Sequence, residues 1–262
     1  MWRRYVALGD SFTEGLMDDV GPGGRHRGWA DRVAQALDAQ EPGLRYANLA
    51  VRGRTAPQIA AEQVPAAVSL RPDLVTLGMG INDTLRRRYD PHVTATHLEN
   101  SVRALRSTDA DVVLFAFGDP SRRSMIMGKV RDRIETANAA TLSIAKRYGC
   151  RVVDFWGCAV FDADSVWDED RLHLSPEGHA IAAAAVLEEL GVGDDAWRTP
   201  FPEPPPHAAA RFASHARWAG GHLAPWLVRR VRGRSSGDGV TPKRPDLGPV
   251  AQPGDARSTQ GS

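Results

Sequence analysis

A serine, a histidine and an aspartate lie where predicted strands end, and these are the side chains that nucleophilic catalysis needs. Ser11 follows the strand expected over residues 5–8, where Gly9 interrupts the apolar run. A serine hydroxyl is a weak nucleophile until a base removes its proton, and a neutral imidazole such as His173 does this near pH 7. Asp170 precedes His173 by three residues and can reach the other ring nitrogen, where a carboxylate fixes the tautomer and stabilises the imidazolium. The pattern indicates an activated serine.

An activated serine also requires hydrogen-bond donors for the oxyanion that forms when it attacks a carbonyl. The candidates are the backbone N–H groups of Ser11 and Gly53 and the side-chain amide of Asn82, which follow the first, second and third predicted strands. A glycine lets the backbone approach a reacting atom closely. Asp83, beside Asn82, and His179, on the last predicted helix, are expected to have structural roles.

The elements that must position these residues alternate between strand and helix along the chain. Such alternation predicts a parallel sheet covered by helices on both faces, and a flavodoxin-like strand order is the simplest topology. Ligands bind at the carboxyl ends of the strands of such a sheet, which is where the candidate residues lie. The patterns predict strands over residues 5–8, 44–48, 73–77, 112–117 and 151–155, and helices over 29–39, 55–70, 92–106, 134–148 and 175–190.

In their order and spacing, four blocks of the chain resemble the signature blocks of the SGNH, or GDSL-type, hydrolases. The resemblance extends over roughly residues 3–190, and Phe12 replaces the leucine that names the first motif. The turn at Ser11 is not the Gly-x-Ser-x-Gly elbow typical of the α/β-hydrolases, because position 13 is a threonine. The blocks are Gly9-Asp10-Ser11, Gly53, Gly80-x-Asn82-Asp83 and Asp170-x-x-His173.

This resemblance implies a flavodoxin-like three-layer α/β/α sandwich with a five-stranded parallel sheet. It also implies a serine esterase that cleaves carboxylic esters through an acyl-enzyme, with deacetylase and thioesterase activities left open. Ser11 would be the nucleophile, His173 the base and Asp170 its orienting group, and the oxyanion would be held by Ser11, Gly53 and Asn82. Two alternatives remain: an acyltransferase that uses the same residues, and a non-catalytic flavodoxin-like binding module. The sequence assigns no substrate-binding residues.

Composition limits the partners and cofactors of the protein. Its 262 residues are 42% hydrophobic and 25% charged, which is ordinary for a globular protein, and a net charge of +1 gives no reason to expect nucleic acid binding. We expect a small-molecule ester as substrate, no cofactor and no metal, because no Cys/His spacing resembles a zinc site. The two cysteines cannot form a disulfide scaffold, and the N-terminus lacks the features of a secretory signal, so a cytoplasmic location is expected.

The composition changes after residue 195. We expect a catalytic domain over residues 1–195, a proline-rich linker with a basic and aromatic extension over 196–232, and a disordered tail over 233–262. Two interpretations of the extension stay open. In the first, its aromatic side chains, Trp218 and Trp226 among them, dock on the catalytic domain. In the second, its arginines contact a membrane surface or a partner.

Overall fold

A computed structural model describes residues 2–21, 24–122, 127–200 and 236–250 of the chain. Within them lies a six-stranded sheet with the order β5-β4-β3-β1-β2-β6, in which β1 to β5 are parallel. The predicted five-stranded parallel sheet with flavodoxin-like order is confirmed, and β6 adds an antiparallel strand beside β2. The strands are β1 (Arg4–Leu8), β2 (Arg45–Asn48), β3 (Leu74–Leu77), β4 (Asp111–Ala116), β5 (Arg151–Asp154) and β6 (Arg244–Pro249).

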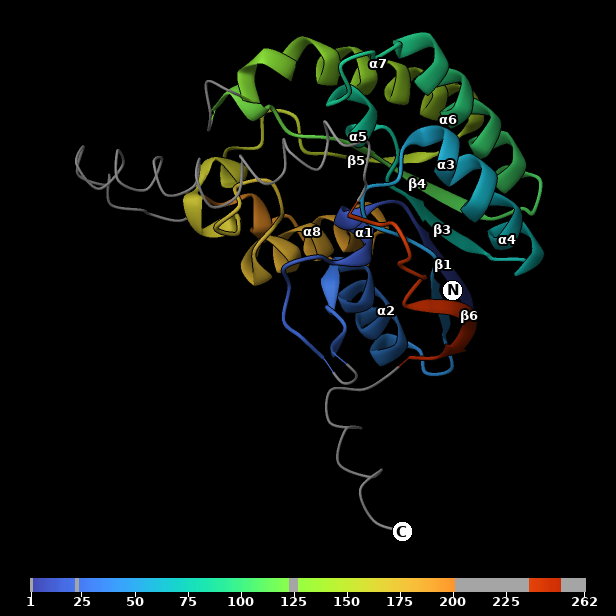
Figure 1. Ribbon diagram of the computed structural model, residues 1–262. Coiled ribbons are helices and arrows are strands. Elements are labelled where there is room, and N and C mark those ends of the chain that lie inside the picture. Colours follow the sequence, from blue (N-terminus) through green and yellow to red (C-terminus); the bar gives the residue numbers. More distant parts are fainter. Residues whose placement is uncertain (1, 22–23, 123–126, 201–235, 251–262) are drawn as a thin grey trace.

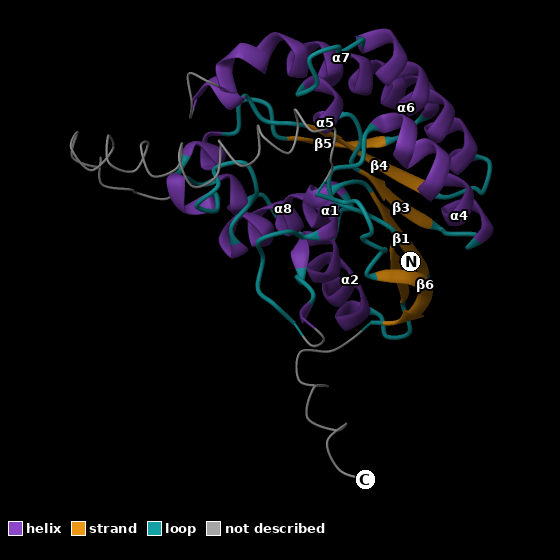
Figure 2. Ribbon diagram, viewed as in Figure 1, coloured by secondary structure: helices purple, strands orange, loops and turns teal. Residues whose placement is uncertain are grey.

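Helices cover both faces of the sheet (Figures 1 and 2). On one face lie α2 (Gly28–Gln40) and α8 (Pro176–Glu189), and on the other lie α6 (Pro91–Arg106), α7 (Arg131–Tyr148) and a helix that runs through α3, a π-helical turn and α4. Ser175 caps α8 and Pro176 is its first residue, which is a common start for a helix. The shorter helical segments are α1 (Ser11–Glu14), α3 (Ala56–Gln58), the π turn Ile59–Gln63, α4 (Val64–Ser69), α5 (Ile81–Thr84), and the 3-10 turns Pro120–Arg122, Met127–Val130, Ala159–Asp162, Asp164–Val166 and Ala196–Arg198.

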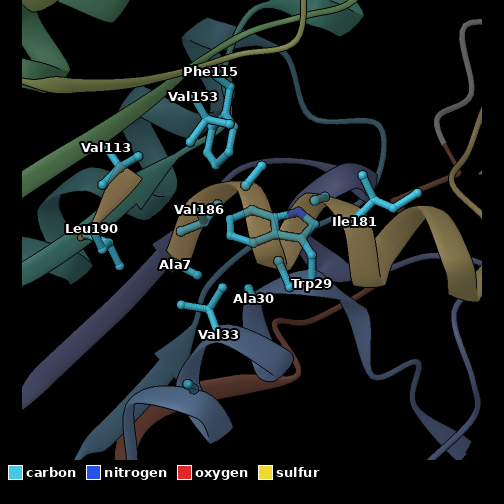
Figure 3. Close-up of a cluster of buried hydrophobic side chains, with 14 of the residues drawn as sticks. Ala7, Trp29, Ala30, Val33, Val113, Phe115, Val153, Ile181, Val186 and Leu190 are labelled. Atoms are coloured by element: carbon cyan, nitrogen blue, oxygen red, sulfur yellow. The ribbon is translucent and has the colours of Figure 1, made fainter. Parts of the chain in front are cut away.

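Each face of the sheet has its own apolar core. Alternate residues of a strand point to opposite faces, so Ala7 of β1 joins one core while Val6 joins the other. Figure 3 shows the first core, where Trp29 of α2 lies among side chains from the strands and from α8. Trp29 is completely buried. Burial on both faces explains the continuous apolar runs in β1 and β4, and it holds the carboxyl end of β1 in a fixed place.

The C-terminal part of the chain differs from the prediction. We expected disorder over residues 233–262, but 236–250 are described and include β6, so disorder is wrong for this stretch. Pairing with the exposed edge of β2 gives its backbone groups partners, and prolines are tolerated in an edge strand. Residues 201–235 and 251–262, with most of the predicted extension, lie outside the described residues. The domain boundary at residue 195 remains a prediction.

Candidate active site

Ser11 is the first residue of α1 and comes three residues after Leu8, the last residue of β1. The Asp10 carboxylate caps this short helix by accepting a hydrogen bond of 3.1 Å from the backbone N–H of Phe12. Gly9 has a φ of +153°, and a Cβ there would lie 2.5 Å from the Thr13 hydroxyl oxygen. Glycine is therefore required at this turn, which holds Ser11 at the carboxyl edge of the sheet.

A cluster of aromatic rings supports the residue after Ser11. The Phe12 ring centroid lies 5.2 Å from those of Trp29 and Phe115, 5.7 Å from that of Phe117 and 6.2 Å from that of Phe155. Tilted and edge-to-face pairs at these separations are favourable. The phenylalanine that replaces the motif's leucine thus anchors the serine turn to the core.

His173 and Ser11 are in hydrogen-bond contact although 162 positions separate them in the sequence. The distance from His173 Nε2 to Ser11 Oγ is 3.0 Å, and that from His173 Nδ1 to Asp170 Oδ2 is 2.5 Å. The other Asp170 oxygen accepts hydrogen bonds of 2.9 Å from the backbone N–H groups of Leu172 and His173. The three side chains therefore form one hydrogen-bonded series.

The loop that carries His173 is closed by its own backbone. The Asp168 N–H donates to the His173 carbonyl at 2.9 Å, and Trp167 and Leu174 form an antiparallel bridge. Ser175 then begins the cap of α8. These backbone hydrogen bonds and the start of α8 together hold His173 in place.

A charged Asp170 favours the tautomer of His173 that carries a proton on Nδ1. Burial disfavours the charged form of Asp170, but hydrogen bonds from the His173 ring and from two backbone N–H groups outweigh it and lower its pKa to about 2. The carboxylate is therefore charged at neutral pH and accepts the Nδ1 proton. The Nε2 lone pair then faces the Ser11 hydroxyl, which is the arrangement that proton removal requires.

Asn82 lies at the start of α5, where Gly80 with a φ of +101° ends the segment after β3. Its side-chain Nδ2 donates to Asp10 Oδ2 at 2.8 Å and to the Arg54 carbonyl at 3.1 Å. Gly53, with a φ of +75°, is the residue before Arg54. The structure thus connects Asn82 both to the serine turn and to the segment that contains Gly53.

Asp10 is buried beside Ser11, and the sequence did not indicate that it contacts Asn82. Burial raises its pKa to about 7, against the opposing effects of the Phe12 N–H, of His173 and of the Asn82 amide. Its position directly beside Ser11 in a buried turn was the available signal. Asp83 has the structural role expected of it, because its carboxylate accepts a hydrogen bond of 2.8 Å from the Ala56 N–H at the start of α3.

His179 also has the structural role expected of it. It is buried, its Nε2 donates to the Leu16 carbonyl at 3.0 Å, and its Nδ1 accepts the Trp29 N–H at 3.3 Å. Burial lowers its pKa to about 4. This histidine is therefore neutral at neutral pH and ties α8 to the segment after α1.

A second feature that the sequence did not reveal is the ion pair between Glu14 and Arg52. The Glu14 carboxylate accepts hydrogen bonds from the Arg52 Nε at 2.9 and 3.1 Å and from the Arg52 backbone N–H at 2.7 Å. Glu14 ends the helix that begins at Ser11, and Arg52 precedes Gly53. This ion pair therefore links the helix that begins at Ser11 to the segment that contains Gly53.

Beside Ser11 and His173 lies a cavity of about 150 Å³ whose walls are largely apolar. Its polar lining includes Asp10 and Asn82 close to Ser11. Aromatic and aliphatic side chains line the rest, a composition typical of small-molecule sites. The apolar lining residues include Ile81, Leu85, Phe117, Ile134, Phe155, Phe161, Trp167 and Leu172.

Within residues 2–21, 24–122, 127–200 and 236–250, no three His, Cys, Asp or Glu side chains are grouped so that they could hold a metal ion. In the same part of the chain, no helix has the length and apolar character needed to cross a membrane.

Several known proteins are similar to this chain in sequence or in fold. An acetylxylan esterase from Geobacillus stearothermophilus is 27% identical in an alignment of 212 residues that covers 72% of this chain and 94% of that protein. LAE5, an alpha/beta hydrolase enzyme from the metagenome of Lake Arreo, is 26% identical with a TM-score of 0.61, covering 74% of this chain and 97% of its own. TesA shares the fold, with a TM-score of 0.61 at 20% identity over 72% of this chain and 98% of its own.

The structure of Axe2, an acetylxylan esterase from Geobacillus stearothermophilus, also shares the fold. It has a TM-score of 0.62 at 21% identity, covering 74% of this chain and 97% of that one. In its catalytic mutants a serine, an aspartate and a histidine are replaced, and that aspartate precedes the histidine by three residues. Residues 7–181 of the present chain match the GDSL-like Lipase/Acylhydrolase family. Because this match covers more than half of its length, the chain belongs to that family.

Proposed function

We propose that this serine ester hydrolase cleaves its substrate through an acyl-enzyme on Ser11. The observation that supports this most strongly is the hydrogen-bonded series from Asp170 through His173 to Ser11, with distances of 2.5 and 3.0 Å. The same three residue types, with the same spacing between aspartate and histidine, are replaced in the catalytic mutants of Axe2. Ser11 is the nucleophile, His173 the general base and Asp170 the group that orients it.

Each half of the reaction passes one proton through His173. Ser11 Oγ attacks the ester carbonyl carbon while Nε2 takes the hydroxyl proton, and a tetrahedral oxyanion forms. The carbon–oxygen bond to the alcohol then breaks, and Nε2 returns the proton to the departing alkoxide. Water next attacks the acyl-enzyme, gives a proton to Nε2, and the acid is released as Ser11 recovers its proton. The charged Asp170 stabilises the imidazolium in both halves.

The proposed oxyanion donors are the backbone N–H groups of Ser11 and Gly53 and the Asn82 side-chain amide. In the structure this amide donates to Asp10 and to the Arg54 carbonyl. To donate to an oxyanion, the Asn82 amide must share or give up the longer of these two hydrogen bonds, the one to the Arg54 carbonyl. Its bond to Asp10 then keeps the amide aimed at the site, which makes Asp10 a positioning residue for Asn82.

The alternatives are less well supported. A binding module has no need of a histidine held between a serine and a charged aspartate. An acyltransferase would use the same residues with an alcohol instead of water as acceptor, and no described feature favours it. The acetylxylan esterase relative makes an acetylated carbohydrate one candidate substrate. A cytoplasmic location also stays a proposal.

An organophosphonate label tests the proposed nucleophile. We expect one adduct per chain, mapped to Ser11 by peptide mass spectrometry, because His173 lies against this hydroxyl. Labelling should slow as pH falls and the imidazole becomes protonated, since a charged ring cannot accept the serine proton. Asp170, with a pKa of about 2, stays charged over the same range and so does not cause the decline. An adduct elsewhere, or labelling that is independent of pH, would contradict the proposal.

The apolar cavity predicts a preference for acyl length. An apolar cavity of similar volume holds one benzene ring, so about six carbon atoms should fit. In a series of p-nitrophenyl esters we expect kcat/KM to rise by about fourfold per methylene up to about hexanoate, since each buried methylene contributes about 0.8 kcal/mol. Leu85→Trp, which fills the cavity, should abolish this rise, whereas Leu142→Trp on the exposed side of α7 should keep it. A series in which acetate is cleaved fastest would show that the cavity does not hold the acyl group, and it would favour the acetylated carbohydrate as substrate.

A further inference from the structure

The segment 236–250 lies beyond the part of the chain that matches the family, yet it is firmly anchored to the domain. Strand β6 pairs antiparallel with β2. The Lys243 side chain is only 8% exposed, forms an ion pair with Asp31, and donates to the carbonyls of His26 at 3.0 Å and Arg27 at 2.6 Å. This charged anchor fixes the place where the segment meets the sheet.

The turn that precedes this anchor lies against Arg52. Gly237 is buried, and a Cβ added to it would lie 2.0 Å from the Arg52 carbonyl oxygen and 3.2 Å from the Arg52 carbonyl carbon. No side chain fits into that space, so the close approach of the two backbones requires glycine at position 237. The carbonyl side of Arg52 is thus in contact with the C-terminal segment.

Glu14 holds the other side of Arg52. Its carboxylate accepts both the Arg52 backbone N–H at 2.7 Å and the guanidinium, and Glu14 belongs to the helix that begins at Ser11. Arg52 is therefore fixed from two directions: by Glu14 from the serine turn, and by Gly237 from the C-terminal segment.

The carbonyl that Gly237 meets belongs to the same peptide unit as the N–H of Gly53. The described peptide bonds are trans, so the C=O and N–H of this unit point in opposite directions. Contact with the carbonyl therefore restrains the direction of the Gly53 N–H. We propose that Gly237 is a positioning residue for the oxyanion hole, through which the segment 236–250 holds the Arg52–Gly53 peptide unit in its catalytic orientation. This inference rests on the proposed function of Gly53 as an oxyanion donor.

Gly237→Ala is the direct test. The φ of Gly237 lies outside the left-handed region, so a methyl group there is opposed by its neighbours alone: chiefly by the Arg52 carbonyl, and also by Val51 Cγ1 at 3.2 Å. We expect kcat to fall by about 10- to 100-fold with KM changed less than about twofold, because a misdirected donor weakens only transition-state binding. The phosphonate labelling rate should fall in proportion, whereas its pH profile, which reports on the ionisable groups beside Ser11, should keep its shape.

Gly239→Ala is the matched control in the same turn. Nothing lies within 4 Å of a Cβ at Gly239, but its φ of +76° strains an alanine. We expect a lower melting temperature with near-normal kcat per active site, which separates lost stability from lost positioning. Active-site titration with the phosphonate gives the active fraction of each variant.

Amide hydrogen exchange tests the contact independently of activity. Peptides that cover residues 50–55 should exchange faster in Gly237→Ala than in Gly239→Ala. If Gly237→Ala does not fold, the double variant Lys243→Met with Asp31→Asn, which removes both charges of the anchor, should give the same loss of kcat and faster exchange. Equal kcat and equal exchange in the two glycine variants would overturn the inference and leave the esterase proposal standing. A parent protein with neither labelling nor ester cleavage would instead overturn the proposed function.

Discussion

Ser11→Ala is expected to lower kcat for ester cleavage by about 10⁶-fold, the loss seen when the nucleophile of a serine hydrolase is removed. Alanine lacks the oxygen that attacks the carbonyl, so no acyl-enzyme can form. The hydroxyl that is lost bonds to His173, and the fold is unaffected because α1 is capped by Asp10 and supported by the ring of Phe12. The measurement is turnover of a p-nitrophenyl ester at saturating concentration, with circular dichroism to verify folding.

Ser107→Ala is a suitable control for this experiment. Ser107 follows α6, is exposed, and its hydroxyl donates to the Ala104 carbonyl at 2.7 Å. We expect normal turnover from this variant. If Ser11→Ala cleaved esters as fast as the parent protein, the acyl-enzyme would have to form on another residue and the proposed mechanism would be wrong.

Asp170→Asn has the second largest expected effect, a loss of about 10⁴-fold in kcat. The side-chain oxygen of an asparagine can still accept hydrogen bonds from the backbone N–H groups of Leu172 and His173, so the loop keeps its shape. The asparagine then presents an amide group to His173 Nδ1 in place of a charged oxygen. That group favours the wrong tautomer, with the proton on Nε2, and it leaves the imidazolium without a countercharge.

Glu169→Gln separates this effect from a general loss of negative charge in the loop. Glu169 is exposed and directly precedes Asp170, and we expect near-normal kcat from its neutral variant. Both variants should melt near the temperature of the parent. An Asp170→Asn enzyme with a kcat within about tenfold of the parent would show that another group orients the imidazole.

The sequence determined the central part of the fold. Continuous apolar runs such as residues 112–117 are too apolar for a sheet with one face in water, so they indicate strands buried on both sides. The glycines at positions 9 and 80 interrupt such runs, and the structure places positive φ angles at both. Because parallel strands end at one edge, these local signals also predicted that Ser11, Asn82 and His173 would share a site.

Only the tertiary structure shows how the site is held together. The bonds of Asp10 to Asn82 and of Glu14 to Arg52 join residues 72 and 38 positions apart, and neither pairing follows a helix or strand period that sequence reasoning could detect. Strand β6 could not be predicted from the sequence either, because its residues Arg244–Pro249 include two prolines and show no alternating apolar pattern. A strand of this kind has little preference of its own for extended structure. Its backbone is ordered by the free edge of β2 and by the ion pair between Lys243 and Asp31, and both partners lie about 200 residues earlier in the chain.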